Sequence, residues 1–339
     1  MMKIIENYSL KSLNTFGVDV KTRYIAEIFS DNDLFKLLED KEFESVRKFI
    51  LGGGSNILFT KDFEGLVIKN SIPGINIIDE DDESIIIETG AGVNWDDFVS
   101  YCVEKKWCGV ENLSLIPGTV GAAPIQNIGA YGQELKNVLY NLEGIFIETG
   151  EKKIFNNYEC KFSYRESIFK NEFKNKFVIT RVGFKLSKKP EVNISYPSIR
   201  EELNNRKISD PKIRDLRKIV VDIRNSKLPD PKIIGNAGSF FKNPVVRNDK
   251  FKMLKEKYPD LNSYPVDDDH VKLSAAALIE KCGWKGKRIG NCGSYEKQPL
   301  VIVNYGEATA GEILELANNI RLSVEENFGV TLQQEVNLV

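Results

Sequence analysis

The sequence predicts a mixed α and β fold with more than one domain. Its 339 residues exceed the length of an average single domain, so two or three domains are expected. Strand-like and helix-like apolar patterns occur together in the first and last thirds of the chain. Two glycine-rich loops, over 51–59 and 114–132, are flanked by apolar segments.

Short strands and one helix are predicted in the first part of the chain. Residues 45–51 and 84–88 have strand patterns, the second as a nearly continuous apolar run. A core-facing helix is predicted over 94–106, because apolar residues recur there at helical spacing. These residues are Trp95, Phe98, Val99 and Cys102.

A further helix is predicted over 211–227. Asp210 can cap it, Pro211 suits its first position, and prolines 229 and 231 prevent its continuation. Its apolar residues follow one helical face and are Leu216, Ile219, Val220 and Ile223. This helix, or the loop after it, is the predicted domain boundary.

The last third is predicted to contain two helices. Ser274 and Gly283 bracket a short alanine-rich helix. Thr309 and Glu312 form a capping-box pattern, and Gly329 stands where a left-handed residue ends a helix. The buried face of this second helix is predicted to consist of Ile313, Leu316, Ile320, Val324 and Phe328.

The tail is predicted to be a strand with one polar face. Apolar and polar residues alternate there, and the apolar ones are Val330, Leu332, Val336 and Leu338. The side chain of Glu335 is therefore expected to point either to water or to a cleft.

Composition excludes several classes of function. The net charge of −2 and the scattered basic residues argue against nucleic-acid binding. Five cysteines without a Cys-x-x-Cys pair make a zinc site or a disulfide framework unexpected, so no metal is predicted. No secretory signal and no apolar run long enough to span a bilayer is present, which favours a cytoplasmic protein without membrane insertion.

Histidine chemistry is nearly excluded as well. The single histidine, His270, follows three aspartates and is predicted to lie on a surface loop. Proton transfer is therefore expected to depend on carboxylates, hydroxyls or a cofactor.

The two glycine-rich loops are candidate nucleotide-binding segments. Residues 51–59 read Leu-Gly-Gly-Gly-Ser-Asn-Ile-Leu-Phe, and backbone N–H groups in such a loop can bind phosphate. The pattern is neither a P-loop nor a dinucleotide fingerprint. The second loop leaves room for backbone to approach a flat ligand. Both loops together favour a ligand, although each alone is equally explained as a tight turn or as packing glycine.

These loops resemble those of the UDP-N-acetylenolpyruvoylglucosamine reductases, a family of flavoproteins. Further motifs of that family occur in order along essentially the whole chain. They are Asn-Thr-Phe-Gly at 14–17, Ser-Tyr-Arg-Glu-Ser at 163–167, Lys-Leu-Pro-Asp-Pro at 227–231, Gly-Asn-Ala-Gly-Ser-Phe-Phe-Lys-Asn-Pro at 235–244, and Gln-Glu-Val at 334–336. The run at 235–244 is the most specific of them.

The resemblance implies an α+β fold: an FAD-binding fold of the vanillyl-alcohol-oxidase type in two subdomains, followed by a smaller α+β substrate-binding domain. The expected parts are FAD-binding subdomains at 1–64 and 65–215, a substrate-binding domain at 216–325, and a C-terminal strand at 326–339 that returns to the active site. The segment at 194–197 resembles the tyrosine loop of the longer subclass. A monomer is expected.

The implied activity is the reduction of UDP-N-acetylglucosamine enolpyruvate to UDP-N-acetylmuramate in peptidoglycan precursor synthesis, with NADPH as electron donor and FAD as cofactor. The residues implied to bind FAD are Gly52, Gly53, Gly54, Ser55, Asn56, Pro117, Gly118, Gly121, Ala122, Ala123 and Asn127. Those implied to bind the UDP-sugar are Tyr196, Lys227, Asn243, Tyr264 and Gln298.

Three residues match the family's catalytic positions. Arg165 is implied to hold the substrate carboxylate, since a guanidinium can bind it through two parallel hydrogen bonds. Ser239 is implied to give a proton to the α-carbon, and Glu335 to assist Arg165 in its protonated form. Without the resemblance, an ordinary surface ion pair is the preferred interpretation of Arg165. The plain alternative for Ser239 is a turn hydroxyl that bonds to its own backbone, and that for Glu335 is an exposed strand carboxylate.

Two other functions compete with this prediction. One is an oxidase of the same FAD-binding fold that acts on an alcohol or another small molecule. The other is a protein that binds a UDP-sugar or flavin without turnover. Neither function would require Arg165, Ser239 and Glu335 together.

Overall fold

The computed structural model describes residues 2–339, which form two compact units. Unit 1 consists of residues 2–8, Thr22–Gly53 and Phe63–Arg224. Unit 2 consists of Ser9–Lys21, Gly54–Asp62 and Asn225–Val339. The four predicted parts are continuous ranges, whereas each of these units combines separate segments of the chain. The predicted boundaries therefore stay a prediction.

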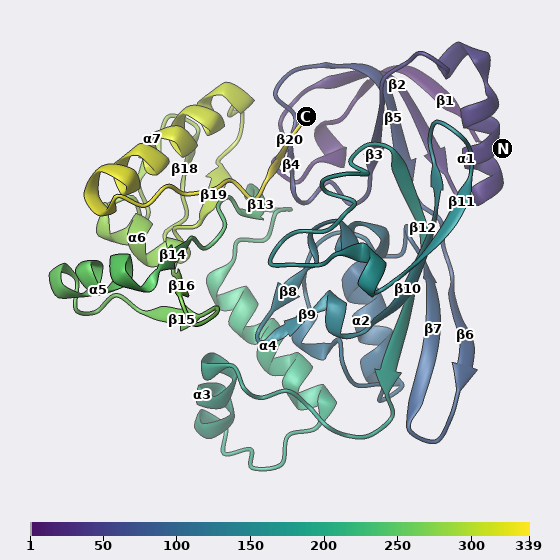
Figure 1. Cartoon of the computed structure of the whole chain (residues 1–339). Coiled ribbons are helices and arrows are strands. Elements are labelled where there is room, and N and C mark those ends of the chain that lie inside the picture. The colour runs from purple at the N-terminus through teal and green to yellow at the C-terminus, as the bar shows by residue number, and fades with distance from the viewer. Residues whose placement is uncertain (1) are drawn as a thin grey trace. The chain divides into compact units, whose positions relative to one another are not determined.

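Unit 1 contains two sheets (Figure 1). The first has the order β1-β2-β5-β3, formed by Ile4–Ser9, Lys21–Ile28, Phe63–Asn70 and Lys48–Leu51. The last three of these strands pair in parallel. Helix α1 (Asp31–Glu39) buries Leu34 and Leu37 in the core that this sheet shares.

The second sheet of unit 1 is antiparallel, with the order β11-β10-β12-β7-β6. Its strands are Lys152–Asn156, Leu139–Phe146, Phe177–Ser187, Ser84–Gly90 and Ile75–Glu80. Helix α2 (Trp95–Glu104) packs on it through the predicted apolar face, which is fully buried. Asn94 caps α2 by accepting the N–H groups of Asp96 and Asp97.

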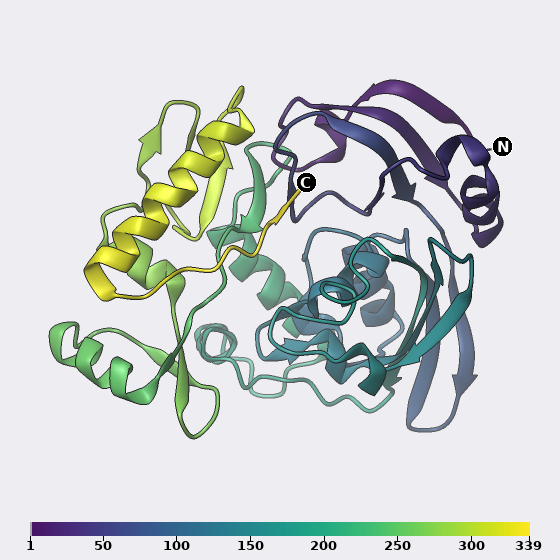
Figure 2. The ribbon, with the colours of Figure 1, turned by 45° about the horizontal axis from the view of Figure 1, so that its top comes forward.

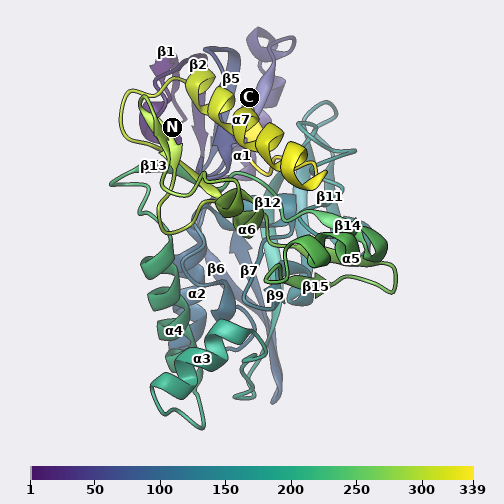
Figure 3. The same ribbon diagram turned by 90° about the vertical axis from the view of Figure 1, so that its left-hand side faces the viewer.

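Unit 1 also contains helices α3 (Pro197–Asn205) and most of α4 (Ile213–Lys227). Figure 3 shows the ribbons of these two helices next to each other. Their apolar faces share a small core that includes Ile199 and Leu216. A hairpin of β8 (Gly129–Ala130) and β9 (Gln133–Glu134) completes the strands of this unit.

Unit 2 is built on the sheet β13-β19-β18-β17. Its strands are Gly235–Ser239, Val301–Asn304, Cys292–Ser294 and Arg288–Ile289. Helix α7 (Ala310–Phe328) packs across this sheet, as the yellow ribbon in Figure 2 shows. Helix α6 is Ala275–Lys281 and α5 is Asn248–Lys257.

Two smaller sheets complete unit 2. One has the order β14-β16-β15, formed by Val245–Arg247, His270–Leu273 and Ser263–Pro265. The other pairs β4 (Ile57–Leu58) in parallel with β20 (Asn337–Leu338), which attaches the end of the chain to the first glycine loop.

Most of the predicted helices are confirmed. The Thr309 hydroxyl accepts the N–H of Glu312 at 3.2 Å, and the Glu312 carboxylate accepts the N–H of Thr309 at 2.8 Å. Gly329 ends that helix at φ +58°, in the left-handed region. Ser274 likewise caps α6 by accepting the N–H of Ala277.

Four local predictions are wrong in detail. Strand β3 begins at Lys48 and not at 45, because the Val46 N–H bonds to the Phe43 carbonyl in a preceding turn. Helix α4 begins at Ile213, since the carboxylate of Asp215, and not that of Asp210, accepts the N–H of Lys212 at 2.9 Å.

The other two errors concern His270 and the tail. His270 is the first residue of β16, where its ring nitrogen lies 2.8 Å from the Asp267 carboxylate. In the tail, only Asn337 and Leu338 form a strand, and Leu338 is exposed. Val330, Leu332 and Val336 are buried as predicted.

Candidate functional site

Gly52 and Gly53, the part of the first glycine-rich loop that belongs to unit 1, lie against the second loop, and this contact requires glycine. A Cβ atom on Gly53 would stand 2.7 Å from the Cα of Gly118, and one on Gly52 would stand 2.7 Å from the Thr119 hydroxyl. A Cβ on Gly121 would stand 2.4 Å from that of Ala91. Backbone therefore lies against backbone here, and a side chain at Gly52 or Gly53 would have no room.

The second loop has an irregular backbone that its surroundings hold in place. Leu115 and Asn127 have φ angles of +59° and +44°, which side-chain-bearing residues rarely adopt. The N–H of Leu115 donates to the Asp96 carboxylate at 2.5 Å. Burial opposes ionisation of Asp96, but hydrogen bonds from Arg217 and from Leu115 outweigh it and lower the pKa of this carboxyl.

Asn127 connects the second loop with the segment that carries Arg165. Its amide nitrogen donates to the Ser163 carbonyl at 3.1 Å and to the Glu134 carboxylate at 3.0 Å, while its amide oxygen accepts the N–H of Lys136. The side chain is therefore used within the protein, and a cofactor contact at Asn127 would fall to its backbone.

Arg165 projects from a tight turn toward the second loop. The N–H and C=O groups of Ser163 and Glu166 bond to each other across this turn, and Arg165 within it has φ +57°. One guanidinium nitrogen donates to the Gly129 carbonyl at 2.7 Å. A strained backbone that aims one cation at a glycine-rich loop is typical of a functional residue.

The structure adds Arg224 and Tyr131 to this group, which the sequence analysis missed. Arg224 donates to the Leu115 carbonyl at 3.2 Å and forms a hydrogen bond with Tyr131. Burial lowers the pKa of Arg224, against the opposing effects of Tyr131 and Asp96. One feature of the sequence indicated Arg224. It stands seven residues after Arg217 in the predicted helix, so both arginines lie on the same helix face.

Tyr196 lies beside Tyr131 of the second loop. Its ring meets that of Tyr131 edge to face, with centroids 5.3 Å apart. The Asn112 amide donates to the carbonyls of both Tyr131 and Asn193, each at 2.9 Å. The loop before α3 is thereby fixed to the glycine-rich segment of unit 1.

Unit 2 brings Ser239 and Glu335 to neighbouring positions. Ser239 ends β13, after a register shift and a left-handed Gly238 whose N–H bonds to the Asn236 side chain. The next residue, Phe240, accepts the Glu335 N–H at 2.8 Å. Glu335 is only 9% exposed, so the expectation of a plain exposed strand carboxylate is wrong.

The first glycine loop contributes one residue to the same part of unit 2. The Asn56 side chain lies 3.5 Å from the Glu335 carbonyl, and the Asn56 carbonyl accepts the N–H of Asn337 at 3.1 Å. Space beside Gly238, the residue before Ser239, is open, because a Cβ added to Gly238 would meet no atom within 4 Å apart from its chain neighbours.

The remaining predicted substrate residues differ in their surroundings. Gln298 lies in the turn before β19, and its side-chain oxygen is buried without a hydrogen-bond partner within residues 2–339, which is typical of a group that meets a ligand. Asn243 instead accepts the N–H of Ala275 at the start of α6. Lys227 and Tyr264 are exposed.

The predicted cofactor-binding residues with small side chains differ in their surroundings. Ala123 is part of the hydrophobic core of unit 1, and Ala122 lies against Gly52. A Cβ on Gly54 would overlap the Leu13 carbonyl, at 2.0 Å. Ser55 is half-buried and Pro117 is exposed. No group of metal-ligating side chains occurs between residues 2 and 339, and no helix there is long and apolar enough to cross a membrane.

Known protein families match both halves of the chain. Residues 23–152 match the family model described as "FAD binding domain", and residues 230–339 match "UDP-N-acetylenolpyruvoylglucosamine reductase, C-terminal domain". The two matches confirm the resemblance and the presence of an FAD-binding domain followed by a further domain.

Full-length relatives carry the same description. The chain is 47% identical to the UDP-N-acetylenolpyruvoylglucosamine reductase of Flavobacterium johnsoniae, with all of both chains covered. It is 48% identical to that of Amoebophilus asiaticus, again over both full lengths. It is similar in fold to the Thermus caldophilus reductase, with a TM-score of 0.68 and 22% identity over 100% of this chain and 99% of the other. The fold class is thereby confirmed.

Proposed function

Because the chain belongs to the UDP-N-acetylenolpyruvoylglucosamine reductases, we propose that it reduces UDP-N-acetylglucosamine enolpyruvate to UDP-N-acetylmuramate with electrons from NADPH and with FAD as cofactor. The observation that carries this proposal is the main-chain hydrogen bond from the Glu335 N–H to the carbonyl of Phe240, the residue after Ser239, which holds the segments of two catalytic matches together in unit 2. The chain is also similar to these enzymes over its full length. We also propose that the enzyme is cytoplasmic and monomeric.

The chain's own residues fit FAD at the contact of the two glycine-rich loops. A Cβ on Gly53 would overlap Gly118, so the backbones of the two loops lie directly against each other at this point of unit 1, with no room for a side chain at Gly53. Backbone N–H groups of the two loops would hold the diphosphate. When bound, the flavin supplies the hydride for the enolpyruvyl methylene carbon.

Three residues would then act on the enolpyruvyl group. Arg165 would bind the substrate carboxylate and stabilise the negative charge that develops there when the methylene carbon is reduced. Ser239 would give its hydroxyl proton to the α-carbon, which completes the conversion of the carbon–carbon double bond to a single bond. Glu335 would donate a hydrogen bond to the same carboxylate.

The predicted substrate-binding residues have separate proposed roles. Gln298, with its unsatisfied buried oxygen, and Lys227, as a point charge for the diphosphate, are the proposed contacts in unit 2. Tyr196, supported by Tyr131, is the proposed contact in unit 1. Asn243 would bind only through atoms that its bond to Ala275 leaves unused.

Product analysis tests the proposed activity. Incubation of the FAD-loaded protein with NADPH and the enolpyruvyl UDP-sugar should give a product that has gained one hydride and one proton. Unchanged sugar after NADPH has been consumed would point to an oxidase that uses oxygen, and unchanged NADPH and sugar would point to a binding protein.

The role of Glu335 is tested by two substitutions. Glu335→Gln keeps a hydrogen-bond donor, so we expect most of the turnover to remain. Glu335→Ala removes the donor, and turnover should fall by roughly 10- to 100-fold, the value of a hydrogen bond to a charged group. Equal losses in both variants, measured as kcat, would contradict hydrogen-bond donation by Glu335.

The contact of the glycine loops is tested by Gly53→Ala. The added Cβ would overlap the Gly118 backbone, so the loops must separate, at a cost in folding free energy of about 1–3 kcal/mol. We expect a lower Tm and weaker retention of FAD during gel filtration. Gly311→Ala is the control, because its Cβ would have no neighbour closer than 3.8 Å. Undiminished FAD binding in Gly53→Ala would contradict the proposed FAD site at this contact.

A further inference from the structure

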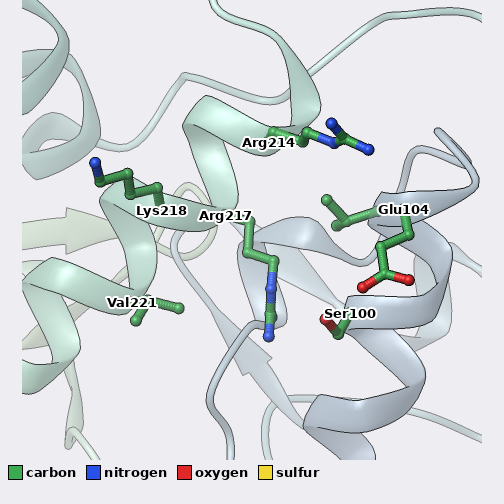
Figure 4. A pocket seen from close by; sticks show the side chains of 7 residues that line it. Ser100, Glu104, Arg214, Arg217, Lys218 and Val221 are labelled. Atoms are coloured by element: carbon green, nitrogen blue, oxygen red, sulfur yellow. The ribbon is translucent and has the colours of Figure 1, made fainter.

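A groove with a volume of about 690 Å³ lies between α2 and α4 of unit 1, and it includes none of the residues assigned to FAD or the UDP-sugar (Figure 4). Its volume is in the range of small-molecule sites. The lining residues are Ser100, Val103 and Glu104 of α2, and Arg214, Arg217, Lys218 and Val221 of α4.

The groove is formed by one complete face of each helix. The four residues of α4 are spaced at i, i+3, i+4 and i+7, and the three of α2 at i, i+3 and i+4. Figure 4 shows Arg217 reaching from α4 toward α2, with Arg214 above it. Val103 and Val221 supply an apolar part of the lining.

The charges of the groove are unequally matched. Arg217 is neutralised by Asp96, to which it donates two hydrogen bonds of 2.7 and 2.9 Å. Arg214 and Lys218 are exposed, and their side chains make no ion pair or hydrogen bond anywhere within residues 2–339. Glu104 is the one carboxylate among the lining residues, so two unmatched cations face a single anion.

We propose that this groove binds a small phosphorylated molecule that also has an apolar part. Arg214 and Lys218 would hold the phosphate, since a guanidinium and an ammonium group both bind its oxygens well. The apolar part would lie mainly on the half-buried Val221, since Val103 is only 3% exposed. Arg217 would form part of the groove wall and would not bind the phosphate, because its guanidinium is already hydrogen-bonded to Asp96.

Titration calorimetry with phenyl phosphate on the FAD-loaded protein at low ionic strength tests this proposal. We expect saturable binding that is several-fold tighter than that of inorganic phosphate, because the ring buries apolar surface. The double variant Arg214→Ala/Lys218→Ala should weaken binding by about tenfold or more, since two charge-assisted contacts are lost. The control Lys36→Ala/Lys174→Ala removes the same charge from exposed positions of unit 1 and should leave binding unchanged.

A gain of affinity provides a second test. Glu104→Gln removes the one opposing charge from the lining, and phenyl phosphate should then bind several-fold more tightly. Equal affinities in the wild type and the Arg214/Lys218 double variant would overturn the proposal, as would the absence of saturable binding to the wild type. Neither measurement uses the enolpyruvyl sugar, so their outcome is independent of the proposed reductase activity.

Discussion

Replacement of Ser239 by Ala should slow the reoxidation of the reduced protein by the enolpyruvyl UDP-sugar by roughly 10²- to 10⁴-fold, the usual contribution of a positioned proton donor. Reduction of the FAD by NADPH should proceed at the normal rate, because no proton needs to reach a substrate carbon in that step. The two half-reactions are separated by stopped-flow absorbance under anaerobic conditions.

The position of Ser239 is the reason for this expectation. Ser239 follows the left-handed Gly238 at the end of β13, and the space beside that glycine is open. The Glu335 main chain bonds to the neighbouring Phe240, which fixes this part of unit 2. Ser239→Cys serves as a comparison, because a thiol can still give a proton, and it should recover part of the lost rate. Equal slowing of both half-reactions would show that Ser239 supports structure or cofactor binding and does not act as the acid.

Arg165→Lys should have the second-largest effect. Lysine keeps the charge but loses the two parallel hydrogen bonds of a guanidinium. It also cannot donate to a carboxylate while holding the Gly129 carbonyl in the same geometry. We expect kcat/KM for the enolpyruvyl sugar to fall by roughly 10²-fold, because a hydrogen bond to a charged group, worth up to about 3 kcal/mol, is lost.

A matched arginine provides the control for this variant. Arg247 is highly exposed, and its nearest carboxylate, that of Asp249, is 3.7 Å away. Arg247→Lys should therefore leave kcat/KM unchanged. Activity of Arg165→Lys within twofold of the wild type would mean that Arg165 serves only to hold the Gly129 carbonyl and does not bind the substrate carboxylate.

Local sequence patterns predicted the helices well, since their signals lie within a few residues. The capping box of Thr309 and Glu312 and the buried face of α2 depend only on spacing along the chain. The predicted start of α4 is wrong because more than one aspartate near it can accept a backbone N–H. Asp215, and not Asp210, accepts the N–H of Lys212. Patterns of this kind rank such alternatives poorly.

The candidate site was predictable only as separate residues. Arg165, Ser239 and Glu335 were named from motifs, but no pattern indicated that the Glu335 N–H bonds to Phe240 or that Asn56 lies beside that strand. Contacts between residues so far apart in the chain depend on tertiary packing. Tyr131 and Arg224 escaped notice for the same reason, since their partners Tyr196 and Leu115 belong to other segments.

An anaerobic absorbance trace tests the central claim most directly. NADPH is added first to the purified, FAD-loaded protein, and the enolpyruvyl UDP-sugar is added next. The proposed function predicts that NADPH removes the yellow flavin absorbance and that the sugar restores it without oxygen. Loss of the absorbance followed by no recovery with the sugar would contradict the proposed substrate, and a protein that stays colourless after addition of FAD would contradict the proposed cofactor.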